Sequence, residues 1–300
     1  METFTLIFVA ILIGYIMNKR DVFPSDTPII LNQFILYISL PAMALLQIPK
    51  LSLSFDAVIP VIMAWIVMSV SAGVIFYISK RLQFSKEVTG SLMLVGVLGN
   101  TSFVGIPIVQ AYFGDSALPY VLMYDQLGSF IVLSTYGTFV SAYYSSAKNV
   151  DIKTISIKII TFPPFLSLIV AMFFIGSTFN PIVVSVLSSL ADTIIPLALV
   201  AVGLQLKFRL PSEDLKPFFS ALGVKLILAP AIAILITYIF SWESKAALVS
   251  IMEAGMGPMI TAGAIASMSG LAPRLSSAIV GYGTIISLMS TWLLSTLILM

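Results

Sequence analysis

An apolar segment long enough to span a membrane is interrupted at its middle by residues that disrupt helices. The segment covers residues 87–114, and its midpoint carries Asn100, Thr101, Gly105 and Pro107. Proline lacks a backbone N–H and glycine loosens the turn, so nearby carbonyl and amide groups lose their intrahelical partners. Unpaired backbone groups are not tolerated where a helix faces lipid. The segment therefore predicts a broken helix whose open backbone faces a cavity inside the protein.

A second segment, residues 243–270, repeats this arrangement. Its midpoint carries Glu253, Gly255, Gly257 and Pro258. Two hydrophobic segments interrupted by glycine and proline, in corresponding halves of a chain, are the best sequence indicator of a secondary transporter's binding site.

Composition places the chain among polytopic integral membrane proteins, with the lipid bilayer as its surroundings. Of its 300 residues, 59% are hydrophobic and only 9% are charged, against about 25% charged residues in soluble domains. The chain contains no cysteine and no histidine, which excludes thiol nucleophiles, disulfides, imidazole bases and the usual zinc sites. Nothing in the sequence supports nucleic-acid binding, an enzymatic activity or a cofactor other than a sodium ion.

The apolar segments predict ten membrane-spanning helices, each near the 20 residues that a bilayer requires. The first is preceded by Glu2 and followed by Lys19 and Arg20, the reverse of a secretory signal, so we expect it to be retained. Prolines at positions 41, 163, 164 and 196 are expected to kink the helices that contain them. The expected spans are residues 3–17, 28–48, 56–79, 87–114, 116–146, 154–175, 181–206, 213–240, 243–270 and 273–300.

Lysine and arginine residues are distributed unequally between the two sides of this topology. Twelve lie in the loops after the first, third, fifth, seventh and ninth spans, and two, Lys50 and Lys245, lie on the opposite side. The remaining one, Lys225, lies within the eighth span. Because cytoplasmic loops carry the excess of basic residues, both termini are expected outside the cytoplasm.

The chain also contains an internal repeat. ISLPAMALLQI around Pro41 resembles TIIPLALVAVGLQL around Pro196, an offset of 155 residues, and the same offset relates Asn100 to Gly255. Residues 1–150 and 151–300 would each hold five spans. Because five is odd, the second half would lie upside down relative to the first, and the two broken helices would cross near the bilayer midplane.

Two stretches resemble the auxin efflux carrier family in its bacterial branch: GNTSFVGIPIVQAYFG, and GMGPMITAGAIASMSGLAPRLSSAIVGYGTIISL. The resemblance implies an all-α, ten-helix inverted-repeat fold related to the bile-acid sodium symporters and sodium–proton antiporters. In that fold spans 1, 2, 6 and 7 form a scaffold, often a homodimer, and spans 3–5 and 8–10 form a mobile transport domain that works as an elevator. It further implies a bacterial or archaeal cytoplasmic membrane protein that moves small organic anions, such as malate, malonate or auxin-like acids.

The ninth span departs from the pattern of many such relatives. It reads Glu253-Ala254-Gly255-Met256-Gly257-Pro258, which resembles the sodium-binding Glu-X-Gly-Met stretch of bile-acid symporters. An acid beside the break favours transport that is coupled to sodium or protons.

The crossing is the expected site of both solute and cation. A carboxylate would meet the half-helix N-termini and nearby side chains, whereas sodium or a proton would be held by oxygen ligands. Two structural alternatives remain: Asn100 as a helix cap, and Glu253 as an ion-pair partner of Lys225. The expected solute-binding residues are Asn100, Thr101, Ser102, Pro107, Asp192, Gly255, Met256, Gly257 and Pro258, and the expected cation-binding residues are Glu253, Asp125, Asn100, Thr101, Gln126 and Ser129.

Other functions are also compatible with parts of the pattern. A cation–proton antiporter on the same fold would use the acids and Lys225 without an organic solute, and an uncoupled facilitator would move the anion alone. An intramembrane aspartyl hydrolase could use Asp125 and Asp192, but the chain has no GxGD stretch.

Overall fold

The computed structural model describes residues 2–51, 54–145, 157, 160–206 and 214–298. Within these ranges the chain is helical, and the β-type pairing found there is one isolated bridge between Gly99 and Pro258. The predicted all-α class is thereby confirmed for these residues. Five helical stretches are long and apolar enough to cross a membrane: Thr27–Lys50, Phe55–Arg81, Pro181–Gln205, Leu215–Ile239 and Pro273–Ile298. Shorter apolar helices cover Thr5–Lys19, Thr101–Phe113 and Pro163–Met172, so the count of ten spans stays a prediction.

The first half of the chain supplies eight α-helices in the described ranges, several joined through wider π-helical turns. The π-helical turns are η1 (Ile35–Ser39), η4 (Thr101–Gly105), η6 (Met123–Phe130) and η7 (Leu133–Gly137). The helices are α1 (Glu2–Lys19), α2 (Thr27–Phe34), α3 (Leu40–Gln47), α4 (Ile59–Arg81), α5 (Lys86–Val95), α6 (Ile106–Phe113), α7 (Leu118–Leu122) and α8 (Thr138–Tyr144).

In the second half the described residues form eight α-helices and one π-helical turn. The turn, η9 (Val224–Leu228), joins α13 to α14. The helices are α10 (Pro163–Met172), α11 (Pro181–Ala191), α12 (Ile194–Gln205), α13 (Leu215–Gly223), α14 (Ala229–Ile239), α15 (Lys245–Ala254), α16 (Ile260–Met268) and α17 (Pro273–Ile298).

Proline accounts for three of the π-helical turns. The turns η1, η4 and η9 each end two residues before a proline, at Pro41, Pro107 and Pro230. A proline ring collides with the carbonyl four residues earlier and cannot donate to it, and a wider turn relieves that collision. In η4 the Gly105 amide donates to the Asn100 carbonyl, five residues back, at 3.0 Å.

The prolines of the predicted sixth span have a different role from the expected one. Pro163 and Pro164 occupy the first positions of α10, where a missing N–H has no helical partner to lose, so they begin a helix and do not kink one. Most of the predicted beginning of that span, at residue 154, lies outside the described residues. The predicted seventh span is divided at Asp192 and Thr193 into α11 and α12.

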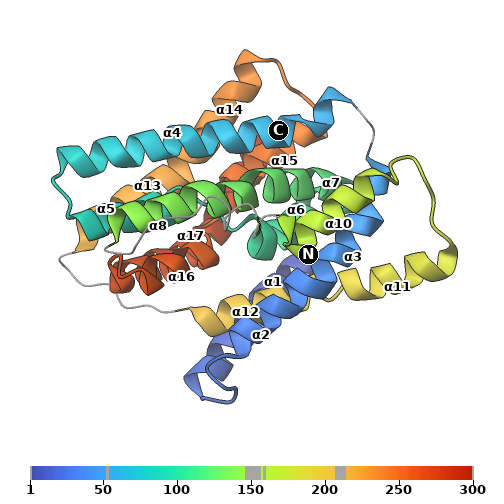
Figure 1. The fold of residues 1–300 in the computed structure, drawn as a ribbon, viewed down its shortest axis with the longest axis horizontal. Helices are drawn as coiled ribbons and strands as arrows, with labels where there is room; N and C mark the ends of the chain where they lie inside the picture. The colour runs from blue at the N-terminus through green and yellow to red at the C-terminus, as the bar shows by residue number, and fades with distance from the viewer. Residues whose placement is uncertain (1, 52–53, 146–156, 158–159, 207–213, 299–300) are drawn as a thin grey trace.

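The helices form two groups that meet along the middle of the molecule (Figure 1). In one group α1 and α2 pack on α12, and α3 packs on α10 and α11. In the other group α4, α5, α8 and α13–α17 pack together, with α16 lying against both α5 and α17. The backbones of α1 and α12 are in direct contact, because a Cβ at Gly203 would lie 2.2 Å from the Ile11 carbonyl oxygen.

Candidate functional site

The two helix breaks meet, as the sequence predicts. The Asn100 amide donates to the Gly257 carbonyl at 2.8 Å, and the Met259 amide donates to the Leu98 carbonyl at 2.9 Å. These two bonds make the short antiparallel bridge that joins α5–η4–α6 to α15–α16. The expectation that the open backbone faces a cavity is therefore wrong for these four groups, because each break supplies the partners that the other lacks.

Asp125 is a buried carboxyl group with a full set of donors. The hydroxyl groups of Thr101 and Ser102 donate to its Oδ1 at 2.5 and 2.6 Å, and the Gln126 amide donates to its Oδ2 at 2.5 Å. Thr101 and Ser102 lie on η4, whereas Asp125 and Gln126 lie on η6. This carboxyl group therefore fixes the second half of the broken helix against the helix that follows it.

Glu253, near the end of α15, is the opposite case. Its side chain is completely buried, and no donor lies within hydrogen-bond distance of either carboxyl oxygen. The carboxyl group points at η4, since a Cβ at Gly105 would lie 2.5 Å from Oε2 and 2.7 Å from Oε1. It also interacts electrostatically with Asp125 and Lys225. A buried carboxylate without donors is unstable, so this group requires a proton or a cation.

Other buried polar atoms of the predicted site also lack partners. They are the Asn100 Nδ2, the Gln126 Oε1 and the Ser129 Oγ. Two of the three are oxygen atoms that can accept a hydrogen bond or coordinate a cation, whereas the Asn100 amide is a donor. The described residues contain no cluster of three histidine, cysteine or acidic side chains, so a cation here would need hydroxyl and amide oxygens beside the two carboxyl groups. Such a donor set suits a hard cation such as sodium.

Asn100 combines the two roles considered for it. Its Oδ1 accepts a 3.2 Å bond from the Phe103 amide, which is a capping interaction at the beginning of η4. Its Nδ2 is buried and free to donate. The side chain therefore caps the second half-helix while keeping one donor for another partner.

Lys225 does not form the ion pair considered for it with Glu253. Its Nζ donates a 2.8 Å bond to the carbonyl of Ala254, the last residue of α15. The Glu253 carboxyl oxygens remain without a partner.

The remaining predicted residues divide into two sets. Gly255, Met256, Gly257 and Pro258 are buried at the break between α15 and α16, and Pro107 is buried at the beginning of α6. Asp192 is exposed at the junction of α11 and α12, outside the buried cluster of the crossing.

Two features of the site are not evident from the sequence pattern. The first is that most of its polar side chains lie on π-helical turns: Thr101 and Ser102 on η4, Asp125, Gln126 and Ser129 on η6, and Lys225 on η9. Such turns are frequent at functional sites because they redirect side chains and loosen the backbone. The prolines that follow η4 and η9 are the sequence signal that could have predicted two of them.

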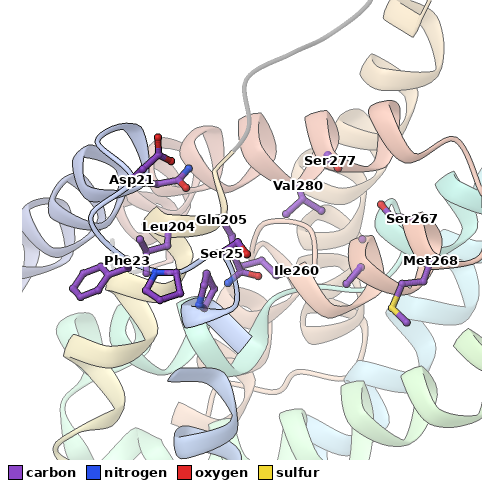
Figure 2. A pocket seen from close by; sticks show the side chains of 15 residues that line it. Asp21, Phe23, Ser25, Leu204, Gln205, Ile260, Ser267, Met268, Ser277 and Val280 are labelled. Carbon is purple, nitrogen blue, oxygen red and sulfur yellow. The ribbon is translucent and has the colours of Figure 1, made fainter. Parts of the chain in front are cut away.

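The second feature is a cavity of about 460 Å³ between the two helix groups (Figure 2). Ser25 and Gln205 line it from the group that contains α1, α2 and α12. Ser267 and Ser277 line it from α16 and α17, and Ile260 begins α16 directly after the break. The cavity therefore extends from the helix ends beside the predicted cytoplasmic loops towards the crossing.

Comparison with known proteins agrees with a role in transport. A family model described as membrane transport protein matches residues 1–295. The chain is similar to an uncharacterised transporter of Methanothermobacter thermautotrophicus, with 24% identity over 96% of this chain and 95% of the relative. It is also similar to an uncharacterised transporter of Methanocaldococcus jannaschii, with 26% identity over 69% of this chain and 68% of the relative.

Proposed function

Because the chain belongs to the membrane transport protein family, that of the auxin efflux carriers, we propose that it is a secondary transporter of a small organic anion. Transport is coupled to sodium or protons through Glu253. The ten spans form two inverted repeats of five, and the group with α4, α5, α8 and α13–α17 moves past the group with α1–α3 and α10–α12. The family and the two relatives support transport itself, whereas the solute, the coupling and the movement belong to this proposal.

The observation that carries the proposal is the unpartnered carboxyl group of Glu253. It lies at the crossing of two broken helices, completely buried, with both oxygens free of donors. A structural acid in this position would have acquired donors, as Asp125 has from Thr101, Ser102 and Gln126. Ionisable groups inside a membrane protein are costly and mark pathways for ions and protons. Glu253 is therefore the group that exchanges a cation.

Asp125 has a different part in the proposed mechanism. Because its oxygens accept from Thr101 and Ser102 on η4, it orients the residues beside Glu253. Gln126 and Ser129, on the same π-helical turn, hold unpartnered oxygen atoms that can complete a cation's coordination. A cation bound there would join α15 to η4 and η6.

The solute is proposed to bind beside this cation. Asn100 Nδ2 is a buried donor without a partner, and α16 begins directly after the Gly99–Pro258 bridge. A helix N-terminus and a free amide donor both favour a carboxylate. The cation reduces the repulsion that the two nearby acids would exert on that carboxylate, which is the physical reason for coupling.

The test is a thermal-shift titration of the purified protein with dicarboxylates, monocarboxylates and indole acids, each with and without sodium and at several pH values. A ligand at 100 times its Kd stabilises the folded state by about 2.7 kcal/mol. We expect sodium or low pH to tighten solute binding, and the solute to tighten cation binding by the same factor. Glu253→Gln should remove this linkage, and Glu243→Gln, which alters an exposed glutamate, is the matched control.

The outcomes separate the alternative functions. Solute binding that is independent of both sodium and pH would contradict coupling and describe an uncoupled facilitator. A response to cations without a response to any organic anion would favour the cation–proton antiporter, and uptake of labelled malate into proteoliposomes distinguishes that case.

A further inference from the structure

Lys225 is a buried ammonium group placed against the break in the ninth predicted span. Its side chain is 3% exposed, and its Nζ donates to the carbonyl of Ala254 at 2.8 Å. Ala254 ends α15, so this carbonyl belongs to the negative end of the helix dipole. The ammonium therefore takes the place at this helix end that a bound cation would otherwise occupy.

The same ammonium also lies against the break in the fourth predicted span. A Cβ at Gly99 would lie 3.0 Å from the Lys225 Nζ and 3.1 Å from its Cε, so the amine packs on the backbone at Gly99, within the break between α5 and η4. Gly99 is the residue that bridges to Pro258. Lys225 thus contacts both breaks at the point where they are joined, and a Cβ at position 99 would require the lysine side chain to shift by a few tenths of an ångström.

The charges around the crossing are two acids and one base. Glu253 interacts electrostatically with both Asp125 and Lys225, yet the base bonds to a backbone carbonyl and leaves the Glu253 oxygens free. One fixed positive charge and two carboxylates leave a single negative charge, which one monovalent cation neutralises.

We infer that Lys225 is a positioning residue that supplies a resident cation to the crossing. Its ammonium fills one cation position permanently, at the Ala254 carbonyl and the Gly99 peptide, and a single exchangeable cation binds, at the site that contains Glu253. The identity of the exchangeable position rests on the proposed function, whereas the role of the ammonium in joining the two breaks does not.

The first test replaces the tethered amine with a free one. Lys225→Ala in the purified protein should lower Tm by at least about 4 °C, and methylammonium chloride should restore at least half of that loss. Choline chloride, whose cation is too large for the space of a lysine amine, should restore none. Lys245→Ala, which removes an exposed lysine that donates a hydrogen bond to Ser116, should change neither the Tm nor its response to methylammonium. An unaltered Tm in Lys225→Ala, or equal effects of the two salts, would overturn the inference.

A second variant covers the case in which Lys225→Ala does not fold. The chain contains no cysteine, so Lys225→Cys offers a single thiol. Treatment with 2-aminoethyl methanethiosulfonate attaches a primary amine of nearly the same length as lysine, whereas methyl methanethiosulfonate attaches a neutral group. Only the amine should restore the wild-type Tm, and equal restoration by the two reagents would assign Lys225 to packing alone.

A third readout addresses the number of exchangeable cations. A tenfold rise in sodium should tighten solute binding by up to tenfold in the wild type and by up to 100-fold in Lys225→Ala, where sodium can fill both positions. Equal sodium dependence in the two proteins would contradict a resident cation. A wild type whose solute affinity ignores sodium and pH would instead refute the proposed coupling, and the methylammonium result would still decide the role of Lys225.

Discussion

The substitution Gly105→Ala should move the Glu253 carboxyl group while leaving the protein folded, so it tests the position of that group independently of stability. Gly105 ends η4, and the added Cβ would lie 2.5 Å from Oε2, 2.7 Å from Oε1 and 2.9 Å from Cδ of Glu253. Contacts of 3.4 Å or more are ordinary, so the carboxyl group must move from 2.5 to 3.4 Å, which is about 0.9 Å. The atoms that must move are the far end of a flexible side chain, and the backbone can stay in place.

The expected consequence is a folded protein with altered coupling. In a helical position alanine is favoured over glycine by about 1 kcal/mol, which offsets part of the cost of moving the carboxyl group. We therefore expect a Tm within about 4 °C of the wild type. A displacement of about 1 Å in a binding constellation costs about 100-fold where geometry is critical, so we expect cation linkage to fall by at least about tenfold.

The assay is the sodium and pH dependence of solute binding by thermal shift, measured on the wild type and two alanine variants. Gly73→Ala on α4 is the control, because a Cβ there meets no atom within 4 Å. The double variant Gly105→Ala with Glu253→Ala removes the contact and should be at least as stable as Gly105→Ala. Wild-type linkage in Gly105→Ala would refute the assignment of Glu253 as the coupling group. Loss of the folded protein in Gly105→Ala, with no recovery in the double variant, would refute the steric reasoning.

Three further predictions concern other parts of the molecule. Asn100→Ala should fold, with its free energy of unfolding lowered by about 1 kcal/mol because the cap is lost. It should no longer bind the solute, because the backbone bridge persists while the free amide donor disappears. Wild-type solute affinity in this variant would reduce Asn100 to a cap. Gly203→Val should prevent accumulation of the folded protein, as measured by size-exclusion chromatography. The added Cβ would lie 2.2 Å from the Ile11 carbonyl oxygen, and a backbone atom cannot move aside as the end of a side chain can. Gly223→Val is the control, because a Cβ at that position has no atom within 4 Å. Ser277→Cys should react with a membrane-impermeant maleimide from the cytoplasmic face, because this serine lines the cavity near the predicted cytoplasmic loops. The chain contains no cysteine of its own, so the label reports this position alone. Labelling only from the opposite face would contradict the predicted orientation.

The sequence predicts the crossing because its signals are local. Glycine and proline within apolar segments weaken helical bonding wherever the chain folds, so both breaks could be placed, and the bridge between Gly99 and Pro258 confirms that they meet. The inverted repeat rests on the similarity between the stretches around Pro41 and Pro196, and the ten spans rest on a count of apolar segments; both stay predictions.

The detailed pairing within the site depends on distances across the fold. The sequence shows Asp125 and Glu253 alike as acidic residues within apolar spans. In the structure Asp125 accepts hydrogen bonds from three donors, whereas Glu253 accepts none. That difference arises from the direction in which η4 presents Thr101 and Ser102, which a one-dimensional pattern does not contain. The same limit applies to Asp192, whose place at an exposed helix junction separates it from the other predicted residues.

The bridge between the breaks also bears on how the proposed alternating access would be achieved. Two hydrogen bonds, Asn100 to Gly257 and Met259 to Leu98, satisfy the backbone groups that each break leaves open, and separating them inside a membrane would leave four unpaired groups at several kcal/mol each. Lys225 and the contact between Glu253 and Gly105 add further links across the same point. The two broken helices therefore favour movement as one body. The cavity between the two helix groups is lined in part by hydroxyl and amide side chains, such as Ser25, Gln205 and Ser277, which water can solvate, so movement between the groups is expected to leave fewer polar groups unpaired. The bonds across the crossing therefore favour the elevator displacement of the proposed mechanism over an opening of the crossing itself.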